Sequence, residues 1–265
     1  MQNKVCNVEI TNPDKLIYKA DKLTKLDVVN YYIDIAPQML PYIKDRPVSV
    51  IRCHDGIEGE KFFKKHPSTE TGDIGKTIID DAEYFCISTI NQLITQVQMG
   101  TIEFHTWGCK KDKVERPDTM IFDLDPDENL PLDKLRQGVK NVKSVLDELG
   151  LDSNLKTSGG KGFHIIVPFR RNKTWEEFGD LAKQISEVVV AKWPRLYTTN
   201  IRKDQRGGKI FIDYLRNKRG ASCVAPYSLR AREHAPISMP ITWQQLDIMR
   251  PNQINLTNYK DFLTK

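Results

Sequence analysis

The chain has 265 residues, 39% of them hydrophobic, which is ample material for a buried core. Its formal net charge of +5 is too small to indicate nucleic-acid binding alone, although basic residues cluster between Arg202 and Arg219. The five cysteines include no Cys-x-x-Cys pair, which argues against a zinc ribbon, and no stretch resembles a signal peptide or a membrane span. We therefore expect one soluble, cytoplasmic unit without membrane contacts.

Helical and strand-like patterns of apolar residues alternate along the chain, which predicts an α+β or α/β domain. The expected elements are a helix from Thr24 to about Met39, a strand Val48–Cys53, a hairpin of strands Thr77–Ile79 and Tyr84–Ile87, a helix Asn91–Gln98, a strand around Asp123, a helix opened by Pro131 and stopped by Gly150, a strand His164–Val167, a helix from Thr174 to before Pro194, and a strand Ile210–Asp213. Two of these helices start with the spacing of a capping box, and Pro37 is expected to kink or end the first.

Three aspartates lie on apolar runs that read as strands. Asp123 and Asp125 flank Leu124, and strand alternation points both acids to one side. Asp213 would join them from a neighbouring strand. Acids on an apolar strand are costly without a positive partner, and a hard divalent cation takes carboxylate oxygens. These residues are therefore candidate metal ligands, the alternative being that the first two are solvated acids in a turn before Pro126.

Residues 158–164, Ser-Gly-Gly-Lys-Gly-Phe-His, form a second candidate site. Their three glycines allow a backbone to approach a ligand closely, and Ser158, Lys161 and His164 offer donors to phosphate oxygens. The order matches neither a Walker loop nor a Rossmann fingerprint, so a plain strand connection is the alternative. Arg216 and Arg230, beyond the Asp213 strand, would clamp a triphosphate or else be surface charges.

Two aromatic features are less specific. Phe62 and Phe63 precede Lys64 and would present a ring for base stacking beside a cation, or else pack in the core. His105 is a lone histidine, and such residues are more often structural than functional.

Three segments resemble, in order, the motifs of the archaeo-eukaryotic primase superfamily: Asp123-Leu124-Asp125-Pro126, residues 158–164, and Asp213-Tyr214-Leu215-Arg216-Asn217. The resemblance is closest to the polymerase domain of the bacterial ATP-dependent DNA ligase D, and it covers nearly the whole chain. It implies an α+β primase-like core with central mixed or antiparallel sheets flanked by helices. It also implies one primase-polymerase domain over residues 1–265, in which residues 1–115 supply DNA-end and template contacts and residues 116–265 carry the catalytic motifs.

The resemblance implies a role for each motif residue. The three aspartates would bind two ions, Mn²⁺ or Mg²⁺. Further implied contacts are Ser158, Lys161, His164, Arg216 and Arg230 with the nucleotide phosphates, His105 with the sugar, Lys15 and Lys25 with the 5′-phosphate of the downstream strand, Phe62 or Phe63 with the template, and Arg52 and Lys64 with DNA.

The inferred reaction is template-directed nucleotidyl transfer, in which one metal ion activates the primer 3′-hydroxyl and the other neutralises charge on pyrophosphate. The resemblance implies preference for Mn²⁺ and ribonucleotides, and extension or filling-in of DNA ends during non-homologous end joining. It further implies a nucleoid-associated protein working with a Ku-like end-binding protein and an ATP-dependent DNA ligase. The alternatives are a replicative-type primase, which the missing Cys-x-x-Cys disfavours, and an inactive DNA-end-binding module, which the three aspartates disfavour.

The chain departs from the family in three respects. Thr106 stands where the family usually has proline, and the hairpin between Lys76 and Asn91 looks short, which puts end synapsis in doubt. No ligase or phosphoesterase segment is present, so we expect either an excised domain or a stand-alone protein with a separate ligase.

Overall fold

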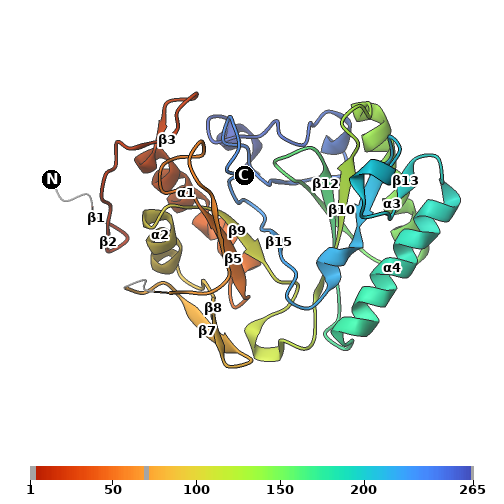
Figure 1. Ribbon diagram of the computed structural model, residues 1–265, viewed down its shortest axis with the longest axis horizontal. Helices are drawn as coiled ribbons and strands as arrows, with labels where there is room; N and C mark the ends of the chain where they lie inside the picture. Colours follow the sequence, from red (N-terminus) through yellow and green to blue (C-terminus); the bar gives the residue numbers. More distant parts are fainter. Residues whose placement is uncertain (1–3, 69–71, 264–265) are drawn as a thin grey trace.

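The computed structural model describes residues 4–68 and 72–263 and builds one main sheet from each half of the chain (Figure 1). The helices are α1 (Lys25–Ile43), α2 (Ile90–Gln98), α3 (Leu132–Glu148) and α4 (Trp175–Lys192). The strands are β1 (Lys4–Val5), β2 (Val8–Glu9), β3 (Leu16–Tyr18), β4 (Leu23–Thr24), β5 (Val48–Arg52), β6 (Phe62–Lys64), β7 (Lys76–Ile79), β8 (Ala82–Phe85), β9 (Thr101–Thr106), β10 (Thr119–Pro126), β11 (Asn154–Thr157), β12 (Phe163–Pro168), β13 (Tyr197–Thr198), β14 (Ile210–Asp213), β15 (Cys223–Val224) and β16 (Pro240–Ile241).

The sheet of the second half has the strand order β13-β14-β10-β12-β11-β16. Its neighbours are antiparallel except β13 and β14, so it is a mixed sheet. Helices α3 and α4 contact each other and the central strands, and Figure 1 shows both on the side away from the first half. Phe122 and Leu124 of β10 are fully buried, as their alternation predicts, which leaves Asp123 and Asp125 for the other face of the sheet.

The sheet of the first half has the order β15-β9-β5-β8-β7, with β6 also paired to β5. Helices α1 and α2 pack together, and α2 contacts β9. Strand β15 comes from the second half of the sequence, and its Cys223 pairs with Thr106 of β9. One continuous cluster of buried side chains includes residues of both halves. The first half is thereby fixed against the second, next to the motifs predicted to be catalytic.

Helix α1 is longer than expected. It continues to Ile43 through Pro37 and Pro41, so the expectation that it ends near Met39 is wrong. Each proline removes one N–H from the helical ladder, but Met39 and Ile43 are fully buried, and such packing supplies most of the stability of a helix in a protein. Both expected capping boxes form. No helix in the described part of the chain combines the length and the apolar character needed to cross a bilayer.

The hairpin of β7 and β8 has a tighter turn than expected. Asp80 and Asp81 alone connect the strands, with φ angles of 49° and 61°, and two left-handed residues are the signature of a type I′ turn. The second strand therefore starts at Ala82 rather than Tyr84, which corrects the predicted four-residue connection.

Candidate active site

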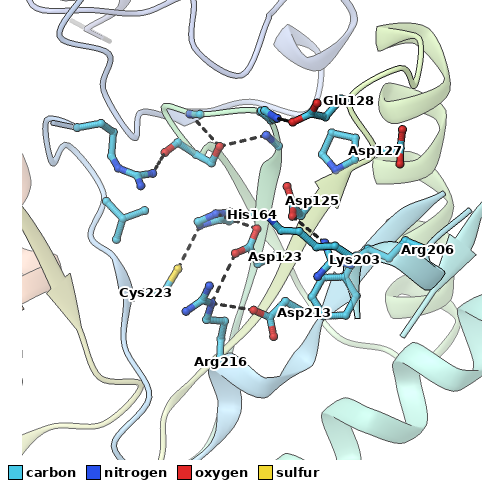
Figure 2. A pocket seen from close by; sticks show the side chains of 18 of the residues that line it. Asp123, Asp125, Asp127, Glu128, His164, Lys203, Arg206, Asp213, Arg216 and Cys223 are labelled. Atoms are coloured by element: carbon cyan, nitrogen blue, oxygen red, sulfur yellow. Dashed lines mark hydrogen bonds and ion pairs between the residues drawn. The ribbon is translucent and has the colours of Figure 1, made fainter. Parts of the chain in front are cut away.

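Three adjacent strands place the predicted catalytic acids beside His164. Asp123 on β10 is the direct partner of Asp213 on β14 and, on its other side, of His164 on β12. Asp125 lies two residues further along β10, and Figure 2 shows the acids and the histidine facing one pocket. The expectation that Asp213 joins the acid pair from a neighbouring strand is confirmed.

The facing acids share one cation. Nε of Arg216 lies 3.1 Å from Oδ2 of Asp213 and 3.6 Å from Oδ2 of Asp123, while Nε2 of His164 lies 3.2 Å from Oδ1 of Asp123 (Figure 2). Burial acts to raise the pKa of Asp123, but the charges of His164 and Arg216 outweigh it and hold that pKa well below its usual range. Burial raises the pKa of Asp213 despite Arg216. Negative charge at Asp213 is therefore incompletely compensated.

Asp125, the third acid, forms an ion pair with Arg206, which belongs to the basic cluster between Arg202 and Arg219. Nη1 of Arg206 lies 3.1 Å from Oδ2 of Asp125, and its guanidinium carbon lies 3.9 Å from the centre of the Phe211 ring. Among residues 4–68 and 72–263, no three acidic, histidine or cysteine side chains enclose a point that could hold a metal ion. The donor set still suits a hard divalent cation, because three carboxylates reach one pocket and Asp213 lacks full charge compensation.

Contacts within the protein fix the conformation of the glycine-rich loop, residues 158–164. The Ser158 hydroxyl accepts hydrogen bonds from the backbone N–H groups of Gly160 and Gly162. A Cβ at Gly162 would lie 2.0 Å from the carbonyl oxygen of Leu124 on β10, so only glycine fits there. Lys161 sits at the exposed rim and forms an ion pair with Glu128. The loop and the acids line one pocket of about 750 Å³, a size typical of small-molecule sites.

A buried glutamate joins two of the predicted nucleotide contacts. Oε2 of Glu103 lies 2.9 Å from both Nε of Arg230 and Nε2 of His105, and its other oxygen accepts from the backbone N–H of Ala231. Although burial acts to raise the pKa of Glu103, the bonds from His105 and Arg230 lower it to about 2. Sequence reasoning missed Glu103, but it lies two residues before His105 on β9, and strand alternation puts both on one face.

Four of the residues predicted to contact DNA line a second pocket, of about 560 Å³. Its lining includes Lys15, Lys25, Arg52 and Lys64. Nζ of Lys25 donates to the carbonyl oxygen of Thr11, and burial, with a smaller effect of Lys15, lowers the pKa of Lys25 to about 8. The cation of Lys15 pairs with an exposed acid, Asp55.

Arg52 differs from the two lysines in burial. Its side chain is 3% exposed, and Nη2 donates to Oε1 of Gln96 while Nε bonds the hydroxyl of Thr101. The phenylalanines of β6 are instead open to solvent, with Phe62 38% and Phe63 52% exposed. The Phe63 ring lies 6.2 Å from that of His105, a residue that lines the pocket of the three aspartates.

Comparisons with known proteins decide the family. A model described as "LigD, primase-polymerase domain" matches residues 24–265. The chain belongs to the LigD primase-polymerase family. It is 41% identical over 256 residues to the multifunctional non-homologous end joining protein LigD of Pseudomonas aeruginosa, covering 94% of this chain and 30% of that protein. It is 30% identical over 241 residues to the bifunctional non-homologous end joining protein LigD of Bacillus subtilis, covering 90% and 39%.

A solved structure agrees with this assignment. The polymerase domain of Mycobacterium tuberculosis ligase D in complex with DNA superimposes with a TM-score of 0.88 at 28% identity, covering 96% of this chain and 94% of that one. The expected α+β primase-like fold and the expected class of enzyme, a LigD primase-polymerase, are therefore confirmed. The chain spans about a third of the length of the curated LigD relatives it matches.

Proposed function

We propose that the pocket between β10, β12 and β14 is the nucleotidyl-transfer site of a LigD polymerase that extends or fills in DNA ends during non-homologous end joining. The observation that carries this proposal is the register that sets Asp123 between Asp213 and His164, with the Ser158 loop in the same pocket. The relatives named above are end-joining proteins, and the superimposed polymerase domain was solved with DNA.

The proposed metal ligands are Asp123, Asp125 and Asp213, holding two ions with Mn²⁺ preferred over Mg²⁺. Bound divalent ions would supply positive charge at the attacking and leaving oxygens. Before metal binds, Arg216 and Arg206 neutralise the same carboxylates. A bound divalent cation would therefore take the place of these arginines beside the carboxylates.

The remaining pocket residues are proposed to hold a nucleoside triphosphate. Arg230, Ser158, Lys161 and His164 would bind the phosphates, together with Arg216 once it is released from the acids. His105, held by Glu103, would face the sugar, and ribonucleotides would be preferred. Preorganised cations at the position of the leaving pyrophosphate stabilise the charge that develops there during transfer.

The second pocket is proposed to bind the downstream DNA strand. Lys15 and Lys25 would hold its 5′-phosphate, with Arg52 shaping the pocket wall and Lys64 at its edge. Phe62 or Phe63 would stack on the template. We propose that the protein acts in the nucleoid-containing cytoplasm, beside a Ku-like end-binding protein and an ATP-dependent DNA ligase.

A nucleotide-incorporation assay tests this function and separates it from a replicative primase. Labelled ribonucleotides and Mn²⁺ would be supplied with a gapped duplex carrying a 5′-phosphate, or with an unprimed single strand. We expect extension of the gapped duplex and far less product on the unprimed strand. Equal or greater synthesis on the unprimed strand would favour the primase, and no synthesis on either would favour a DNA-end-binding module.

A further inference from the structure

A short segment of the second half, residues 230–235, carries two arginines to the pocket of the three aspartates. Arg230 and Arg232 both line that pocket. The backbone of this arginine segment is unusual, because His234 and Ala235 have φ angles of 65° and 45°, a left-handed conformation that side chains rarely adopt. Such a conformation persists only where the surrounding structure holds it. The contacts that hold the segment therefore bear on where its arginines lie.

The first half of the chain supplies these contacts to the backbone of the segment. The hydroxyl of Tyr18 on β3 donates to the carbonyl oxygen of Arg230 at 2.9 Å. The ammonium of Lys61 donates to the next carbonyl oxygen, that of Ala231, at 2.7 Å. Glu103, also from the first half, accepts from the Arg230 side chain and from the Ala231 N–H group. An arginine of the second half is thus held from the first.

Tyr18 makes the buried contact of this set. Its ring is fully buried, whereas Lys61 is exposed and the His234 side chain that pairs with Asp21 is 70% exposed. Burial raises the pKa of Tyr18 well above its usual range, so the hydroxyl keeps its proton, and a carbonyl oxygen can only accept it. Without that hydroxyl, the carbonyl oxygen of Arg230 would face an apolar ring edge, a cost that favours a shift of the segment.

We propose that Tyr18 is a positioning residue for nucleotidyl transfer, which holds Arg230 where its guanidinium meets the nucleotide phosphates. Tyr18 does not line the pocket, so it would act through the backbone of Arg230 and not by touching the nucleotide. The part of the chain predicted to contact DNA would then also set the affinity for nucleotide. The consequence for nucleotide rests on the proposed function, which gives Arg230 its phosphate-binding role.

Binding of ATP in the presence of Mn²⁺ and the absence of DNA, measured by calorimetric titration, separates nucleotide affinity from extension. Tyr18→Phe removes only the hydroxyl, and we expect the Kd for ATP to rise about fivefold, a typical effect of losing one neutral hydrogen bond. Thermal unfolding of the same variant would confirm that it folds. An unchanged Kd in folded Tyr18→Phe would overturn the proposal.

Tyr197→Phe is the matched control. Tyr197 is 1% exposed, and its hydroxyl donates to the carbonyl oxygen of Gly138 in α3 at 2.7 Å, so the same kind of buried bond is lost outside the pocket. The two variants should lose similar amounts of thermal stability, but Tyr197→Phe should keep the wild-type Kd for ATP. An equal rise of Kd in both variants would mean that general destabilisation, and not the position of Arg230, weakens binding.

A double-mutant cycle tests whether Tyr18 acts through Arg230. In an Arg230→Ala background, Tyr18→Phe should have no further effect on the Kd for ATP, because the guanidinium that Tyr18 positions is gone. Two independent effects would instead multiply. A further loss of about fivefold in the double variant would contradict the proposal.

Extension kinetics on a gapped duplex connect this contact to the reaction. Tyr18→Phe should lower kcat/KM for nucleotide about fivefold or more, while the Kd for the duplex stays close to that of wild type. Weaker duplex binding with unchanged kcat/KM for nucleotide would assign Tyr18 to DNA binding and overturn the proposal. If Tyr18→Phe weakened ATP binding but wild-type protein extended no DNA, the proposed function would fail while the positioning of Arg230 would hold.

Discussion

Asp123 and Asp213 are directly opposed across the β10–β14 ladder, and Nε of Arg216 lies within 4 Å of both carboxylates. Two facing acids at the centre of a sheet destabilise it unless a positive charge lies between them. The free protein supplies that charge from its own arginine. A divalent cation would meet the same electrostatic demand in the working enzyme.

Arg230 is expected to contribute more to the reaction than Lys161, although both line the pocket. Arg230 is held by Glu103 and by the carbonyl oxygen of Ser158, whereas the Lys161 ion pair is solvent-exposed. Arg230→Ala should raise KM for nucleotide and lower kcat, by about 3 kcal/mol of transition-state stabilisation in all. Lys161→Ala should cost under about 1 kcal/mol. Steady-state kinetics of both variants decide the point: equal losses would mean that preorganisation does not separate them.

Glu103→Gln should damage both stability and nucleotide binding. The amide keeps the shape of the carboxylate but leaves the guanidinium of Arg230 without its charge partner, and breaking a buried pair typically costs about 3 kcal/mol. KM for nucleotide should also rise, because His105 and Arg230 lose their common anchor. Glu83→Gln is the control, since its ion pair with Lys76 is exposed and should be worth under about 1 kcal/mol. Denaturant unfolding and steady-state kinetics would test this, and equal unfolding free energies for the two variants would contradict it.

Gly162 should tolerate no side chain. Gly162→Ala would force a Cβ to within 2.0 Å of the carbonyl oxygen of Leu124, the residue between Asp123 and Asp125, so the loop or β10 must shift. We expect a lower Tm and a large loss of extension activity. Gly179→Ala is the control, because a Cβ there meets nothing closer than 3.5 Å and alanine favours a helix interior by up to about 1 kcal/mol. A Gly162→Ala protein as stable and active as wild type would show that the close approach is not required.

The preference for a 5′-phosphate should depend on pH. Burial lowers the pKa of Lys25 to about 8, so its ammonium is present below that pH and is lost as pH rises through it. Binding of a gapped duplex with a 5′-phosphate should therefore lose its advantage over the 5′-hydroxyl duplex between pH 7 and pH 9. Added salt should reduce the advantage as well, because phosphate contacts release counterions.

Fluorescence anisotropy titrations of the two duplexes measure this preference. Lys15→Ala combined with Lys25→Ala should erase it while leaving extension of a simple primed template nearly normal. Lys183→Ala with Lys192→Ala, on the distant helix α4, is a matched loss of two charges and should preserve it. Equal affinities of wild-type protein for the two duplexes would show that the lysines do not read the phosphate.

Local patterns were sufficient to predict much of the fold and the acid site. The alternation along β10 predicts that Asp123 and Asp125 share a face, and the capping boxes predict where two helices begin. Relationships between distant segments were not predictable in this way. The pairing of β15 with β9, and the ion pair of Arg206 with Asp125, depend on strand register and packing across the fold.

Tertiary packing can override a local signal or add a second cause to it, and the sequence alone does not show this. Pro37 is a helix breaker by local rules, yet α1 continues past it because the following turn is buried. Glycines 159 and 162 suggested a ligand, but each is also required by a close neighbour in the protein, Arg230 and Leu124 respectively. The presence of a glycine in the sequence does not show whether it is required by a ligand or by close packing within the protein.

The acids of β10 and β14 are the proposed site of catalysis, and extension by Asp125→Ala tests this assignment most directly. Labelled nucleotide, Mn²⁺ and a gapped duplex with a 5′-phosphate would be given to wild-type and variant protein, with DNA-end binding measured in parallel by anisotropy. We predict that the variant loses extension while its affinity for the DNA end stays within about twofold of wild type, because Lys15 and Lys25 line a separate pocket. Substantial extension by the variant in Mn²⁺ would contradict the assignment of these acids as the catalytic site.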